Sequence, residues 1–152
     1  MDGERWDREI TLTPGRDWLV VEGLAGRVGR GAAALSLKLE TVALGTILSL
    51  DLLELSLCQY GRVIDVYASD PSLLVGLSAT KRKEHAGHPQ RWKPFLQLPN
   101  APRDLRAAWL EAATLTDKLA SAASMLGVER PQLDAQGTAA RRLRYAQREE
   151  PL

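Results

Sequence analysis

The sequence is poor in cysteine, in aromatic residues and in long uninterrupted apolar stretches. Its 152 residues include one cysteine, Cys58, which has neither a partner for an intramolecular disulfide nor a CxxC spacing for zinc. A disulfide-stabilised secreted scaffold is therefore excluded, and we expect a cytoplasmic protein. Residues 1–10 are charged and polar where a secretory signal needs an apolar stretch, so no export signal is predicted.

The chain also has no apolar run long enough for a membrane-spanning helix. Its most apolar region, residues 35–58, is interrupted by Lys38, Glu40, Asp51 and Glu54, whereas a span needs about 18 consecutive apolar residues. We therefore expect no membrane span.

Neither sign of charge dominates, since 20 Lys and Arg residues oppose 19 Asp and Glu residues for a formal net charge of +1. No overall field then attracts nucleic acid or an anionic membrane, and any such binding must come from a local patch. Hydrophobic residues make up 45% of the chain and charged residues 26%, which is typical of a globular domain with its own core.

Most of the chain before residue 79 indicates short strands. Residues 9–13 and 18–22 flank a Pro-Gly turn and predict a hairpin, which a glycine-rich loop follows at 23–31. Further strands are predicted at 63–68 and 73–78. Residues 79–93 contain almost nothing apolar and predict an exposed loop, after which 94–98 are expected to form a short last strand.

Leucines alternate with polar residues between residues 33 and 60, which is the period of a β-strand. We expect two long strands here, joined by a tight turn near Gly45. The phase of the alternation changes at Leu52 and Leu53, which predicts a β-bulge. Because leucine also favours helices, a helix over 33–58 is the alternative.

An amphipathic helix is predicted over residues 102–126. Pro102 suits the first helical position and Gly127 suits the residue that ends a helix. Apolar residues recur at steps of three and four, as one buried stripe requires. The stripe includes Leu105, Trp109, Ala112, Leu119 and Leu126.

About seven short strands followed by one long C-terminal helix resembles the element order of the pleckstrin-homology-like superfold. The resemblance covers residues 9–127, and Trp109 is similar to the aromatic residue that this family buries in its final helix. It implies an α+β, mostly antiparallel barrel or sandwich capped by helix 102–126. It also implies binding of phosphoinositides, peptides or partner proteins. The rival architecture is another small β barrel, or an α+β sheet with a helix on one face.

We accordingly expect residues 1–127 to form one β-rich domain and residues 128–152 to form a linker with a basic helical tail. The tail's arginines surround Leu143 and form a candidate docking surface for a partner. Its candidate residues are Arg141, Arg142, Arg144 and Tyr145.

Basic residues are also frequent between residues 81 and 93, which contain five Lys and Arg residues and one acidic residue, Glu84. Clustered Lys and Arg neutralise phosphates, and an exposed tryptophan stacks on a base. The candidate anion or nucleic-acid contacts are Lys81, Arg82, Lys83, Arg91, Trp92 and Lys93. A solvated loop is the alternative. The turn after the first predicted strand offers only Arg16, so the lipid-headgroup site usual in the superfold is not expected.

No pattern in the sequence announces catalysis. The chain has no GxSxG motif, and its glycine loop matches no nucleotide-binding motif. His85 and His88 lack the further ligands that a zinc site needs. We expect no enzyme, cofactor, metal or small-molecule substrate. The predicted function is a non-catalytic binding or scaffolding domain with a protein partner or a homo-oligomer, and the alternative is nucleic-acid or other polyanion binding through residues 81–93 and the arginine-rich tail.

Overall fold

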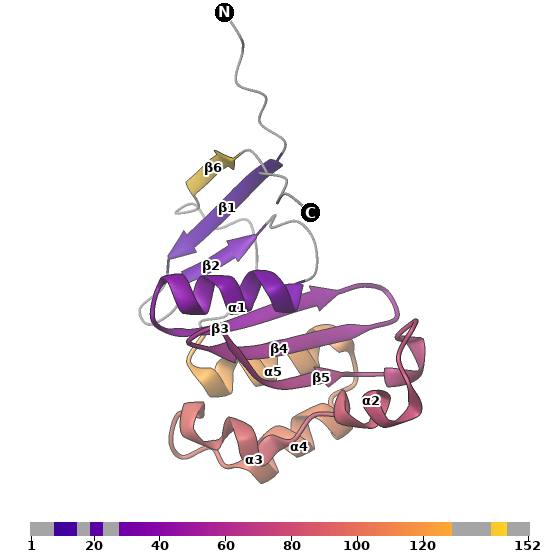
Figure 1. Ribbon diagram of the computed structural model, residues 1–152. Coiled ribbons are helices and arrows are strands. Elements are labelled where there is room, and N and C mark those ends of the chain that lie inside the picture. The colour runs from indigo at the N-terminus through magenta and orange to yellow at the C-terminus, as the bar shows by residue number, and fades with distance from the viewer. Residues whose placement is uncertain (1–7, 15–18, 23–27, 129–140, 146–152) are drawn as a thin grey trace, which may run out of the picture. The chain divides into compact units, whose positions relative to one another are not determined.

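The computed structural model describes residues 8–14, 19–22, 28–128 and 141–145, and side-chain burial for residues 30–128 (Figure 1). The chain divides into two compact units. One comprises residues 1–25 and 128–152, and the other comprises residues 26–127. This division differs from the single domain over 1–127 that the sequence predicts.

The first unit contains a three-stranded antiparallel sheet in the order β2-β1-β6. Its strands are β1 (Arg8–Pro14), β2 (Leu19–Glu22) and β6 (Arg141–Tyr145). The predicted N-terminal hairpin is confirmed by the pairing of β1 with β2. The predicted helical tail is wrong at β6, because pairing with β1 satisfies its backbone groups and overrides local helix propensity.

The second unit begins with helix α1 (Val28–Lys38), where the sequence predicts a loop and then a strand. The alternation of leucines predicts a strand wrongly here, because the buried side chains of this helix are small residues and not leucines. Ala32 and Ser36, four residues apart, are buried, whereas Leu37 is 62% exposed. The small residues allow α1 to approach the sheet closely.

An antiparallel sheet follows α1, in the order β3-β4-β5. Its strands are β3 (Val42–Leu48), β4 (Leu53–Gln59) and β5 (Arg62–Ala68). The chain turns between β3 and β4 at residues 50–51, and Gly45 lies opposite Ser56 within β3, so the predicted turn at Gly45 is wrong. The predicted bulge at Leu52 and Leu53 is also wrong, because the phase change marks the start of β4. A register shift occurs instead at Leu57 and Cys58, against β5.

Short helices take the place of the strands and the loop predicted over residues 73–98. They are η1 (Pro71–Leu73), α2 (Ala79–Glu84), α3 (Pro89–Trp92) and η2 (Lys93–Phe95). Side-chain capping explains α2, because the Ser78 hydroxyl accepts a hydrogen bond from the Lys81 N–H at 3.2 Å.

The predicted helix 102–126 is two helices, α4 (Pro102–Glu111) and α5 (Leu115–Leu126). Its start at Pro102 and its end at Gly127, with φ 92°, are as predicted. The interruption has a local cause. Thr114 caps α5 by accepting the Asp117 N–H at 3.1 Å, and Ala112 has already left the helical conformation.

The second unit has three layers, with α1 on one face of the sheet and α3, α4 and α5 on the other (Figure 1). Leu53, Leu55 and Leu57 of β4 are fully buried on the face that also carries Tyr67, which stacks on Trp109 of α4. Alternation along the strands turns Ser56 and Cys58 to the opposite face.

The predicted seven-stranded barrel or sandwich closed by one helix is therefore wrong. The described strands form two open three-stranded sheets, and the element order on which the pleckstrin-homology-like resemblance rested is not the one observed. No helix among the described residues is long and apolar enough to cross a membrane.

Candidate functional site

The predicted basic loop is divided by the structure into exposed and engaged side chains. Lys81 and Lys83 on α2 and Lys93 on η2 are exposed. Arg82 is partly buried, and its guanidinium donates a hydrogen bond to the Leu74 carbonyl at 3.3 Å. Arg91 lies 3.5 Å from the Asp65 carboxylate. The free positive charge of this segment is thus smaller than the sequence count indicates.

Trp92 lies in the core and not at the surface. Its side chain is fully buried, and its indole N–H donates to Asp65 Oδ2 at 2.8 Å. Its ring meets Trp109 edge to face, with centroids 5.4 Å apart. Base stacking requires an exposed ring face, so Trp92 does not supply the nucleic-acid contact expected from the sequence.

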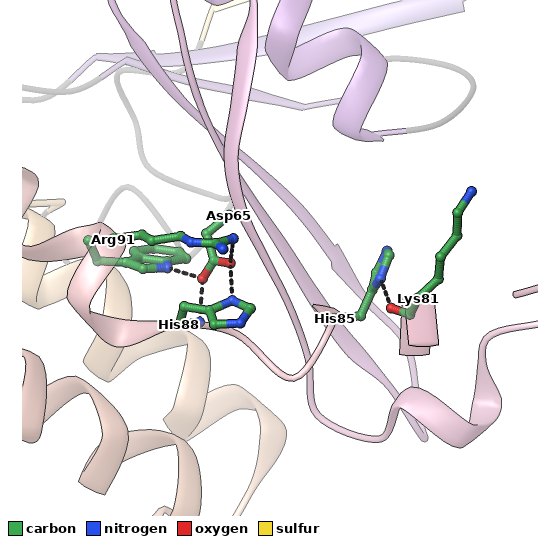
Figure 2. A network of polar contacts seen from close by, with 6 residues as sticks. Asp65, Lys81, His85, His88 and Arg91 are labelled. Carbon is green, nitrogen blue, oxygen red and sulfur yellow. Dashed lines mark hydrogen bonds and ion pairs between the residues drawn. The ribbon is translucent and has the colours of Figure 1, made fainter. Parts of the chain in front are cut away.

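Asp65 organises the cluster of polar contacts that Figure 2 shows. Its side chain is 1% exposed, and its Oδ2 also accepts the backbone N–H of His88 at 2.6 Å. Its Oδ1 lies 3.0 Å from His88 Nδ1. A buried carboxylate requires such partners, since an unpaired charge in the core is costly. The cluster therefore fastens residues 85–92 to β5, assisted by the hydrogen bond from the Ala68 N–H to the His85 carbonyl.

The two histidines of this segment face different partners. His85 Nδ1 lies 2.7 Å from the Lys81 carbonyl, whereas His88 Nδ1 faces Asp65 (Figure 2). Among the described residues, no group of three or more His, Cys, Asp or Glu side chains could hold a metal ion.

Two surface depressions lie beside this segment, and both are open to solvent. The first, of about 340 Å³, is lined by Ala79, Thr80, Lys83, Glu84 and His88. Asp65 holds His88 as an aspartate holds the general base of a catalytic triad. The lining has one hydroxyl side chain, Thr80, and no hydrogen bond joins Thr80 to His88 among the described residues. The second, of about 330 Å³, lies between α3 and α4 and includes Arg103, Arg106 and Leu110. Neither has the enclosed shape of a small-molecule site.

The outer edge of β3 is the most distinctive surface of the second unit. The Tyr60 N–H donates to the Thr41 carbonyl and the Ser49 N–H donates to the Leu52 carbonyl, so residues 41 and 49 both bond toward β4. Hydrogen-bonded residues alternate along an antiparallel pair, so the residues between them direct their backbone groups alternately toward β4 and away from it. Those directed away are Val42, Leu44, Thr46 and Leu48.

These four residues have no strand beside them within the described part of the chain, because β3 is the end strand of its sheet. Natural edge strands are protected by charged side chains, prolines or bulges. The β3 sequence VALGTIL contains no charge and no proline, and its pairing with β4 is regular. Four apolar side chains at its two ends are exposed: Leu39 at 60%, Ile47 at 38%, Leu48 at 44% and Leu50 at 98%. We call this surface, residues 42–48 with those flanking side chains, the β3 edge.

The sequence could not identify the β3 edge, because strand order is not encoded in the period-two pattern. The absence of charge between Glu40 and Asp51 is the one signal that points to it. The candidate docking residues of the tail, Arg141 to Tyr145, lie in β6 and pair with β1. The structure describes the backbone of these residues but not their side chains.

Comparison with known proteins identifies no relative, so any function must be inferred from the residues of this chain. No protein family, no curated protein and no solved structure matches this chain.

Proposed function

We propose that this chain is a non-catalytic protein-binding module whose contact surface is the β3 edge. One observation carries the proposal: the four outward-bonding residues of an uncharged edge strand leave their N–H and C=O groups without a strand partner in the described structure. Added strands bind such edges through main-chain hydrogen bonds, and neighbouring apolar side chains add affinity. The exposed leucines at both ends of β3 supply that apolar area.

The test uses a displayed library of random peptides selected against the immobilised chain. Thr46→Lys places a charge at the middle of the edge, at an outward-bonding position, and Leu48→Lys places one at its end. Val75→Lys is the matched control, because Val75 is 96% exposed and lies outside the sheet. Circular dichroism first establishes that each variant retains the fold.

We expect selected peptides to be extended and apolar, and to lose binding to both edge variants while binding the control like the unaltered chain. Peptides that bind the edge variants equally well, or the absence of any enriched peptide when the immobilised chain is monomeric, would contradict the proposal.

The alternative, polyanion binding through residues 81–93 and the arginine-rich tail, has less support. Lys81, Lys83 and Lys93 remain exposed, whereas Arg82 is hydrogen bonded and Trp92 is buried. Binding through several phosphates must weaken steeply as salt is added. Retention of single-stranded RNA or DNA at low salt, lost on triple substitution of these lysines by glutamate, would favour this alternative.

A further inference from the structure

We infer that the strand which occupies the β3 edge is β3 of a second copy of this chain, paired antiparallel about a twofold axis at Gly45. The inference rests on the proposed function and specifies its partner. It would join two three-stranded sheets into one continuous six-stranded sheet.

The register follows from which residues bond outward. In an antiparallel pair, two residues that face each other and both bond across the gap exchange two hydrogen bonds. With the axis at Gly45, Val42 faces Leu48 of the second copy and Leu44 faces Thr46 of the second copy, and the symmetry repeats both pairs. Every outward-bonding residue of β3 then has a partner.

Gly45 suits the position on the axis. Residues there form a non-hydrogen-bonded pair, in which the two Cα atoms approach to about 4.5 Å. Glycine has no side chain to obstruct that approach. Gly45 itself bonds to β4, since it lies between the outward-bonding Leu44 and Thr46.

The exposed apolar side chains favour an antiparallel copy over an unrelated strand. They lie at opposite ends of β3, with Leu39 before it and Ile47, Leu48 and Leu50 at and beyond its end. Antiparallel pairing brings the start of one β3 beside the end of the other. The two sets of exposed side chains are thereby brought together at both ends of the interface.

Within the paired strands, charge does not oppose self-pairing. Because β3 carries no charge, no like charges oppose each other along the paired strands. Glu40 and Asp51 flank the strand, so antiparallel pairing brings Glu40 of one copy near Asp51 of the other. Their repulsion is a cost at each end of the interface, and Lys38, the last residue of α1 and two positions before Glu40, is the basic residue nearest to them in the sequence.

The experiment combines sedimentation equilibrium with residue-resolved amide hydrogen exchange over a range of chain concentrations. We expect a dimer whose amides at Val42, Leu44, Thr46 and Leu48 become protected as concentration rises, while those of Ala43, Gly45 and Ile47 are protected throughout. Thr46→Lys and Leu48→Lys should each raise the dissociation constant at least about tenfold, and Val75→Lys should leave it unchanged.

Three outcomes overturn the inference, and they differ in what they mean for the proposed function. A monomer whose outward amides exchange freely, and whose edge still binds selected peptides, removes the second copy but keeps the binding module. A monomer whose outward amides are protected at every concentration has its edge covered by its own chain, and both proposals fail. A dimer with freely exchanging outward amides associates through another surface.

Discussion

Asp65 of β5 accepts a hydrogen bond at 2.8 Å from the indole N–H of Trp92, a residue 27 positions later in the chain. This contact joins the sheet to the segment that precedes α4, and it holds Trp92 in the core although the sequence predicts Trp92 in an exposed basic loop. The segment is held on one side by this hydrogen bond and on the other by Trp109, which meets both Trp92 and Tyr67.

Replacing Asp65 by asparagine should therefore destabilise the second unit. The amide oxygen can replace only one of the two carboxylate oxygens. If it takes the place of Oδ2, the NH₂ group stands where Oδ1 faced the Arg91 guanidinium and His88, and the negative charge that paired with Arg91 is lost. We expect a loss of about 2 to 4 kcal/mol in the free energy of unfolding, measured by urea denaturation. Asp51→Asn, at an exposed hairpin position, is the control and should change stability by less than about 0.5 kcal/mol.

Gly87→Ala tests whether residues 85–88 must lie against the aromatic cluster. Gly87 has a φ of +80°, and a Cβ there would lie 2.8 Å from Trp109 Cζ3. Gly76 has the same φ but no atom within 4 Å of the same position, so Gly76→Ala measures backbone strain alone, roughly 1 to 2 kcal/mol.

We expect Gly87→Ala to cost at least about 1 kcal/mol more than Gly76→Ala, since the ring must move or the backbone must shift. Thermal unfolding of the two variants gives the comparison. Equal melting temperatures would mean that the segment does not pack on Trp109 in solution.

Trp109→Ala should cost about 3 to 5 kcal/mol, as expected for removal of a large core side chain. Trp109 is 5% exposed, and its ring stacks on Tyr67 with centroids 4.2 Å apart and planes 6° from parallel. A double-mutant cycle with Tyr67→Leu should give a coupling energy of about 0.5 to 1.5 kcal/mol. A near-zero effect of Trp109→Ala on stability would indicate that Trp109 is not packed in the core and that its apolar side faces a binding partner.

Stability should decrease at alkaline pH. Burial raises the pKa of the Cys58 thiol above its ordinary value of 9.0 and the pKa of the Tyr67 phenol above 10.0. Both groups ionise first in the unfolded chain, so each favours folding below its ordinary pKa and loses that contribution as pH rises toward the folded value.

Thermal unfolding between pH 8 and pH 11 measures this decrease, and Cys58→Ala should make it shallower near pH 9. The same burial predicts that the thiol of the folded chain reacts with a thiol reagent far more slowly than in urea. Reaction at equal rates would contradict the buried position of Cys58.

Local signals in the sequence determined several element ends. Pro102 and Gly127 start and end the C-terminal helical region because proline costs nothing at the first helical position and glycine tolerates a positive φ. The first hairpin followed from its Pro-Gly turn for a similar local reason. The apolar stripe also identified Leu105, Trp109 and Leu126 as core residues, and all three are buried.

Tertiary structure alone decided the rest. The leucine alternation of residues 33–38 predicts a strand, but these residues form a helix. Its buried residues are Ala32 and Ser36, because small side chains allow the helix to pack closely on the sheet. The sequence predicts Trp92 as an exposed aromatic residue among cations. In the structure Trp92 is buried, because Asp65, distant in sequence, accepts its indole N–H. The lack of charge over residues 41–50 marks the β3 segment but does not make it an edge, because whether a strand lies at the end of a sheet depends on which segments pair beside it.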